Sequence, residues 1–354
     1  MPSQQVMAMI IIAQNYRGDV IRQVNRKAAF LRLLKFVPGV GKNVAWVAEG
    51  SGQHAESFNE GSDAENFGSD AQDAATLQWG LYRSNFNVSG LAQAAAATSG
   101  TPFGNLPLWS RNIINATGEL SSKINMALYN GTGIGPNIAG LGVSIGSTTN
   151  IYAGINRVTT PHFRPIVTDP GALTLPTFNS IRQHLGDIYD ASGEVPDIAL
   201  CPTRIFNTIG ALFDDKRRWI QEVTTAQGLI KLEGGCHGIE FDGCVFLRDK
   251  DATTNEIQFV NTHHLWMETL RPVGPALPEG MQATVQANDG FGEFMLSLQY
   301  EMLAKTGDSD KAMVKCYLQL VCDRPNSCGV MKNVAATSDP IPEPGPGGGE
   351  SGGP

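Results

Sequence analysis

The chain has 354 residues, of which 42% are apolar and 17% are charged, and its formal net charge is −8. This length supports a sizeable core in one large or two modest domains. The acidic balance and the lack of a basic stripe argue against a dedicated nucleic-acid-binding protein, which needs cations to neutralise phosphates. Sparse charge with ample apolar content suits a protein that covers much of its surface with copies of itself.

The cysteines and the first apolar run bear on the cell compartment. None of the six cysteines shows CxxC spacing, so we expect free thiols made in a reducing cytoplasm and no zinc site. The apolar run at residues 6–13 is too short to span a bilayer and has no basic leader. We therefore expect no membrane segment.

The first elements are a helix and two strands. Residues 19–36 carry apolar side chains at helical spacing, and Pro38 and Gly39 end that predicted helix. Residues 44–48 form a short strand-like run, and residues 75–88 form a longer one.

The segment between these two strands is acidic. Residues 49–72 hold six carboxylates and no lysine or arginine. The pattern predicts a long two-stranded arm with a polar tip, and its second strand places Leu77, Trp79 and Leu81 on one face. Because an isolated hairpin is marginally stable in water, we expect a neighbouring subunit to cover that face.

Residues 105–130 form the clearest predicted helix. Asn105 can cap its start and Gly131 follows its last turn. At 1.5 Å per residue the helix would be roughly 39 Å long. One continuous apolar stripe runs along it and must be buried, formed by Leu106, Trp109, Ile113, Ala116, Leu120, Ile124 and Ala127.

A small mixed α/β unit follows. Residues 177–189 predict an amphipathic helix, residues 197–201 a short apolar strand and residues 203–213 a second helix. Residues 238–248 and 256–261 look like a hairpin.

The chain closes with strands and a polar tail. Residues 292–303 and 312–322 alternate apolar and polar side chains around a tip at 304–311, which predicts two long strands. Residues 338–354 are rich in Pro, Gly and acids and bury no apolar area, so we expect them to be disordered and dispensable.

Several motifs resemble chemical sites, but each is incomplete. Residues 39–42 match half of a phosphate-binding loop, without its first Gly or its closing Ser or Thr. Cys236 and His237 lie in a Gly-rich turn with no orienting acid nearby in the sequence. Residues 249–260 begin like a calcium loop but lack the Gly and the bidentate Glu that it needs, which favours a hairpin turn. The sequence thus predicts no catalytic, cofactor or metal site.

Two stretches resemble a known family. Residues 150–157 read Asn-Ile-Tyr-Ala-Gly-Ile-Asn-Arg and residues 161–165 read Pro-His-Phe-Arg-Pro. This pair resembles a segment of tailed-bacteriophage major capsid proteins, in which a Tyr-x-Gly-Ile-Asp/Asn-Arg run precedes an aromatic-Arg pair. Residues 317–325 resemble the closing strand of those proteins, and the order of elements over residues 19–334 is similar to theirs.

The resemblance implies the α+β bacteriophage Hong Kong 97 fold. Its axial domain would meet copies of itself around five-fold and six-fold axes. The implied parts are an N-terminal arm (1–41), an extended β-hairpin loop (42–92), a peripheral domain (93–168 and 275–325) with a spine helix (105–130), an α/β axial domain (169–274 and 326–337) and the disordered tail (338–354).

The resemblance also implies a function. The chain would be a non-enzymatic major capsid protein that assembles through hexamers and pentamers into an icosahedral virion shell around double-stranded DNA, formed in the host cytoplasm. DNA would be contacted only non-specifically, and the partners would be a portal, a decoration protein and a separate scaffolding protein, since no long helical extension precedes the arm. Residues expected to matter for assembly are Leu77, Trp79, Leu81, Trp109, Ile113, Arg157 and Arg164.

Two other functions fit the same sequence. A nanocompartment shell protein of the encapsulin type shares this fold, and a cargo enzyme encoded beside the gene would favour it. A hydrolase with a dispersed site is the alternative from another class, and it should behave as a small oligomer in size-exclusion chromatography.

Overall fold

The computed structural model describes most of the chain. The described ranges are 30–50, 55–57, 59–60, 69, 71–98, 108–212, 219–220, 222–225, 228–231, 238–270, 298–305 and 307–339. None of the helices in these ranges combines the length and the apolar content that a membrane crossing needs.

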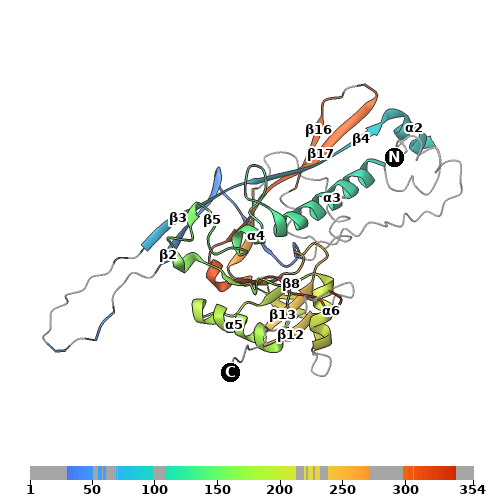
Figure 1. The fold of residues 1–354 in the computed structure, drawn as a ribbon. Helices are drawn as coiled ribbons and strands as arrows, with labels where there is room; N and C mark the ends of the chain where they lie inside the picture. Colours follow the sequence, from blue (N-terminus) through green and yellow to red (C-terminus); the bar gives the residue numbers. More distant parts are fainter. Residues whose placement is uncertain are drawn as a thin grey trace, which may run out of the picture.

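A five-stranded sheet forms one body of the molecule (Figure 1). Its long strand β17 alternates buried and part-exposed side chains, and it pairs antiparallel with three other strands. Only β1 joins the sheet in parallel, against β15. The strands are β1 (Lys35–Pro38), β15 (Leu265–Thr269), β17 (Ser309–Cys322), β16 (Gln299–Leu303) and β4 (Gly80–Ser89).

The helix α3 (Leu108–Asn130) runs alongside β4 and β17 (Figure 1). Ile113, Ile124 and Leu128 are fully buried, so the apolar stripe of this helix fills the core beneath the sheet. The predicted helix is confirmed over its described length, with its end at Asn130, whereas its predicted start at Asn105 lies outside the described residues.

A seven-stranded sheet forms the second body, with its own apolar core. Its helices are α5 (Phe178–Ser192) and α6 (Thr203–Leu212). A capping box between Thr177 and Ser180 starts α5. The strands, in order across the sheet, are β7 (Ile166–Thr168), β18 (Gly329–Met331), β14 (Ile257–Val260), β8 (Ile198–Cys201), β13 (Cys244–Arg248), β12 (Gly238–Phe241) and β9 (Trp219–Ile220).

An antiparallel ribbon projects away from both bodies, on the side opposite the β16–β17 hairpin (Figure 1). It pairs β2 (Asn43–Gly50) with β3 (Ala71–Gln78), and we call it the arm ribbon. The remaining elements are short: α2 (Gly90–Thr98), α4 (Leu141–Ser144), β5 (Ile151–Tyr152), β6 (Ile155–Asn156), η2 (Pro161–Phe163), β10 (Glu222–Thr225), β11 (Gly228–Lys231) and η4 (Pro325–Ser327).

The helices and strands predicted at 44–48, 177–189, 197–201, 203–213 and 312–322 are confirmed. The prediction of a helix through residue 36 was wrong at its end, because Lys35–Pro38 pairs in parallel with β15. The rest of that helix, up to residue 29, lies outside the described part of the chain.

Two predictions about strand pairing were also wrong. Residues 75–88 do not form one strand, because the chain breaks at Trp79 between β3 and β4. Strand β14 does not pair with β13, since β8 lies between them. The strand β8 comes from a distant part of the sequence, and a local reading of the two apolar runs could not place it there.

The sheets also shift the expected domain limits. Strand β15 lies in the five-stranded sheet although it falls within the predicted axial segment 169–274, and β7 lies in the seven-stranded sheet although it falls within 93–168. At the other end, Ser338 and Asp339 hydrogen-bond to Arg204 on α6, so described structure extends two residues into the predicted tail. Residues 340–354 lie outside the described residues.

Candidate assembly surface

Most apolar side chains at the base of the arm ribbon are already covered by other residues of the same chain. Leu77 and Trp79 are buried within the chain. The Trp79 indole N–H donates to the carbonyl of Gly41 at 3.2 Å. A Cβ at Gly39 would lie 2.2 Å from the Trp79 ring, so the close approach requires glycine there. The expectation that a neighbouring subunit covers Leu77 and Trp79 was therefore wrong.

Leu81 differs from these two residues. The break at Trp79 and Gly80 reverses the alternation, so that odd positions are buried in β3 and even positions, such as Tyr82, are buried in β4. Leu81 consequently faces outward and is 53% exposed. Val47 on the arm ribbon is 65% exposed. Among the described residues of the arm ribbon and the start of β4, these two side chains are apolar and largely exposed.

A groove of about 550 Å³ lies beside the base of the arm ribbon. Ile134 and Ile151, which line it, are 76% and 64% exposed. The rest of its wall comes from β3, from the Gly-rich turn after α3 and from the β5–β6 hairpin. Exposed apolar side chains therefore gather where the arm leaves the body of the molecule.

Of the two expected spine residues, Ile113 serves the fold. Ile113 is fully buried in the core under the five-stranded sheet. Trp109 belongs to the first turn of α3, and its side chain lies outside the described part of the structure. Ile113 can therefore affect assembly only through the stability of the subunit.

Arg157 is fully buried within the chain, and its guanidinium bonds to its own backbone. Its Nε donates to the carbonyl of Phe163 at 3.2 Å, and its two other nitrogens donate to Asn150 Oδ1 and to the carbonyls of Val143, Ser144 and Ser147. Its guanidinium lies 5.1 Å from the centre of the Tyr152 ring. Burial lowers the pKa of Arg157 to about 10, so it stays charged at neutral pH.

Arg164 contacts Arg157 and, like it, donates hydrogen bonds to backbone carbonyls. Its Nε donates to the carbonyl of Arg157 at 2.5 Å and its Nη2 to the carbonyl of Val158 at 2.6 Å. The two arginines together hold the segment after α4 in place through bonds to its backbone. This segment supports the base of the arm ribbon, because the Thr76 N–H donates to the carbonyl of Ala153 at 2.8 Å.

The sequence analysis did not predict that Asp249 is a buried carboxylate between the two bodies. It accepts hydrogen bonds from the Tyr129 hydroxyl at 3.0 Å, from the Phe30 N–H at 3.1 Å and from the Asn125 amide at 3.2 Å. Burial and then the charge of Asp249 raise the pKa of Tyr129. The contact ties the end of β13 to α3. Residues 249–255 form a turn, but not the expected hairpin turn, because β13 and β14 are not paired.

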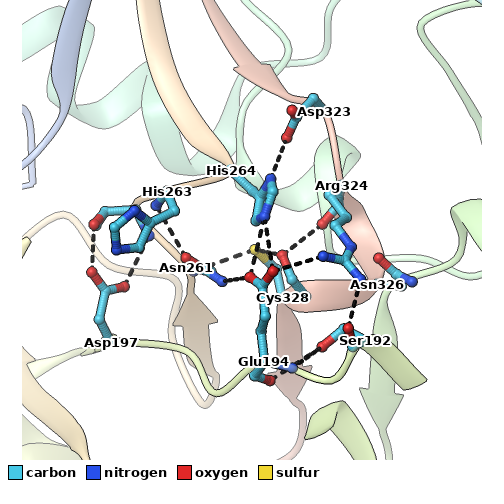
Figure 2. A network of polar contacts seen from close by, with 12 residues as sticks. Ser192, Glu194, Asp197, Asn261, His263, His264, Asp323, Arg324, Asn326 and Cys328 are labelled. Atoms are coloured by element: carbon cyan, nitrogen blue, oxygen red, sulfur yellow. Dashed lines mark hydrogen bonds and ion pairs between the residues drawn. The ribbon is translucent and has the colours of Figure 1, made fainter. Parts of the chain in front are cut away.

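A second polar cluster, missed by the sequence analysis, lies where the chain passes between the sheets (Figure 2). Glu194, after α5, bonds to Arg324 and Asn261, each at 2.7 Å, and approaches His264 at 3.1 Å. His264 also contacts Asp323 at 3.0 Å. Burial would raise the pKa of Glu194, but His264, Arg324 and Asn261 outweigh it and hold that pKa below its usual value. We call this cluster the junction.

Comparisons with known proteins agree on the fold. No protein-family model matches the sequence, and no curated protein matches it. A solved structure of the cyanophage A-1(L) capsid asymmetric unit is 18% identical, with a TM-score of 0.70, and the match covers 92% of this chain and 98% of that chain.

Two further solved structures are similar over nearly the whole chain. The SrpI encapsulin from Synechococcus elongatus PCC 7942 is 11% identical with a TM-score of 0.59, and the match covers 95% of this chain and 98% of that one. The capsid of a native GTA particle is 13% identical with a TM-score of 0.57, covering 91% and 95%. The chain therefore has a mixed α+β architecture with the Hong Kong 97-type fold of tailed-phage capsid proteins.

Proposed function

We propose that this chain is the major capsid protein of a tailed phage, a non-enzymatic subunit that assembles with copies of itself into the virion shell. The observation that carries the proposal is the likeness to the cyanophage capsid over 92% of the chain. The projecting arm ribbon and the exposed apolar side chains at its base support it, because a shell subunit needs surfaces that its neighbours cover.

In this proposal the two bodies have separate roles. The seven-stranded sheet with α5 and α6 is the axial domain, which meets its copies around five-fold and six-fold axes. The five-stranded sheet with the spine helix α3 is the peripheral domain. Hexamers and pentamers would close an icosahedral shell around double-stranded DNA, with a scaffolding protein, a portal and a decoration protein as further partners.

A nanocompartment shell protein of the encapsulin type is the second candidate. The likeness to the SrpI encapsulin supports it, at a lower TM-score of 0.59 against 0.70 for the cyanophage capsid. A cargo-enzyme gene beside this one would favour the nanocompartment, whereas portal, protease or terminase genes would favour the phage.

The arm offers a direct test. Residues 53–70 carry most of the acidic charge of the arm, and deleting them leaves the buried side chains Leu77 and Trp79 in place. We expect the deleted chain to fold and stay soluble, yet to form unstable particles or none on size-exclusion chromatography with light scattering. Each exposed contact contributes on the order of 1 kcal/mol or less, but the contact recurs at every subunit of a shell.

The matched control keeps the length of the arm and removes its charge. Replacing the acids within 53–70 with the corresponding amides should weaken particles less than the deletion does, with a loss that depends on salt. A deleted chain that forms particles as stable as those of the intact chain would contradict the role of the arm between subunits. A small, defined oligomer from both chains would favour the hydrolase.

A further inference from the structure

The junction lies where two passages of the chain cross between the sheets (Figure 2). Residues 261–264 lead from β14 in the seven-stranded sheet to β15 in the five-stranded sheet, and residues 323–328 lead back from β17 to β18. The two passages are bonded to each other, because the Asp323 N–H donates to the carbonyl of His264 at 3.2 Å and the Asn261 N–H donates to Cys328 Sγ at 3.4 Å.

The His264 ring lies between two carboxylates at this crossing. Its Nδ1 is 3.0 Å from Asp323 Oδ1, and its Nε2 is 3.1 Å from Glu194 Oε2. A protonated imidazole donates from both nitrogens and satisfies both contacts. A neutral imidazole has one N–H, so its other nitrogen directs a lone pair at a carboxylate oxygen about 3 Å away, which is repulsive.

The two carboxylates differ in how many other hydrogen-bond donors they have. Glu194 keeps Arg324 and Asn261 as partners whatever the state of the ring, and Arg324 is itself anchored on the carbonyl of Ser192 at 2.5 Å. Among the described residues, the Asp323 carboxylate has His264 as its one hydrogen-bond partner. Loss of the proton therefore leaves one of the two carboxylates without a His264 donor, so the ring no longer links Asp323 to Glu194.

We propose that His264 is a proton-dependent clamp between the two sheets of the subunit: when protonated it bridges Asp323 and Glu194, and when neutral it can donate to only one of them. The other charged or titratable groups near His264 have partners of their own or face solvent. Arg324 is bonded to Glu194, Asp197 is bonded to Thr262, and His263 faces solvent. The clamp belongs to the folded subunit itself and does not depend on a shell.

The direction of the pH effect follows from the bound proton. The hydrogen bond to Asp323 and the charge of Glu194 raise the pKa of His264 above its ordinary value of 6.5. A group whose pKa is raised by folding stabilises the folded state fully below its unfolded value. That stabilisation is lost as the pH rises through the higher folded value, so the junction loosens on the alkaline side of 6.5.

Hydrogen–deuterium exchange of the purified chain tests the clamp. Protection factors, corrected for the intrinsic effect of pH on exchange, are compared for peptides covering residues 261–264 and 323–328 between about pH 6 and pH 9. We expect protection to fall by about tenfold for each unit by which the pKa is raised. Protection that does not change with pH would overturn the proposal.

Three variants separate the clamp from a general pH effect. His263→Gln removes the neighbouring exposed histidine and should keep the full pH response. His264→Gln cannot be charged and should show low, pH-independent protection at the junction. Asp323→Asn weakens the pull on the proton and should move the midpoint to lower pH, which keeps the test valid if His264→Gln fails to fold. A wild-type response in His264→Gln, or an unmoved midpoint in Asp323→Asn, would count against the clamp.

Discussion

Replacing Ile113 with aspartate should leave almost no soluble subunit and no particles. Ile113 is fully buried in the stripe of α3 that fills the core beneath the five-stranded sheet. The substitution buries a carboxylate without a partner, which should reduce the free energy of unfolding by about 4 kcal/mol or more. Such a loss is a large fraction of the roughly 5–15 kcal/mol by which a typical domain is stable. Soluble yield and the thermal unfolding midpoint measure the effect.

The helix α3 supplies its own control. Met126 lies on the same helix and is 48% exposed, so Met126→Asp introduces the same charge on the solvent side. We expect that variant to express and unfold much like the unmodified chain, within about 0.5 kcal/mol. Equal solubility of Ile113→Asp and Met126→Asp would show that the stripe of α3 is not the core of the subunit.

Replacing Arg157 with alanine should also destabilise the subunit strongly. The guanidinium is the buried partner of four backbone carbonyls and of Asn150 Oδ1. Each buried acceptor left unpaired costs about 1–3 kcal/mol, with some of the loss recovered by relaxation or by entering water. We therefore expect a total loss of about 3–5 kcal/mol, measured by chemical denaturation of the soluble subunit.

Two further variants test whether the geometry of Arg157 matters beyond its charge. Arg157→Lys keeps the charge but not the planar fork of donors, so it should lie between wild type and Arg157→Ala in stability. Arg182 is the surface control, because its side chain is 62% exposed and lies 3.9 Å from Asp242. Arg182→Ala should cost about 1 kcal/mol or less. Similar losses in Arg157→Ala and Arg182→Ala would contradict a supporting role for the buried arginine.

Local signals in the sequence predicted α3, α5 and α6, whereas α2 was missed and the helix expected through residue 36 gives way to strand β1. The apolar stripe of α3 recurs at helical spacing over many turns, and Thr177 starts α5 through its capping box. These signals are carried by residues that are neighbours along the chain, and tertiary packing did not alter them. The same holds for β17, whose burial alternates over residues 312–317 and becomes continuous over 318–322.

Strand pairing and buried polar groups could not be predicted in this way. The insertion of β8 between β13 and β14 depends on contacts between distant segments. The break at Trp79 that reverses the alternation comes with a long-range contact of its ring with Gly39. Arg157 looks like a surface cation in the sequence, and only the folded segment shows that carbonyls surround it. The resemblance drew attention to Arg157 and Arg164 without indicating that they bond to the backbone.

Electron microscopy of the purified chain tests the central claim most directly. A capsid subunit expressed alone should appear as hexameric or pentameric capsomers, tubes or closed shells of mixed size, because its surfaces are built to meet copies of itself. The same particles should disappear in the variant lacking residues 53–70. Monomers or a small oligomer without five-fold or six-fold symmetry, under conditions in which the subunit is folded, would contradict the account.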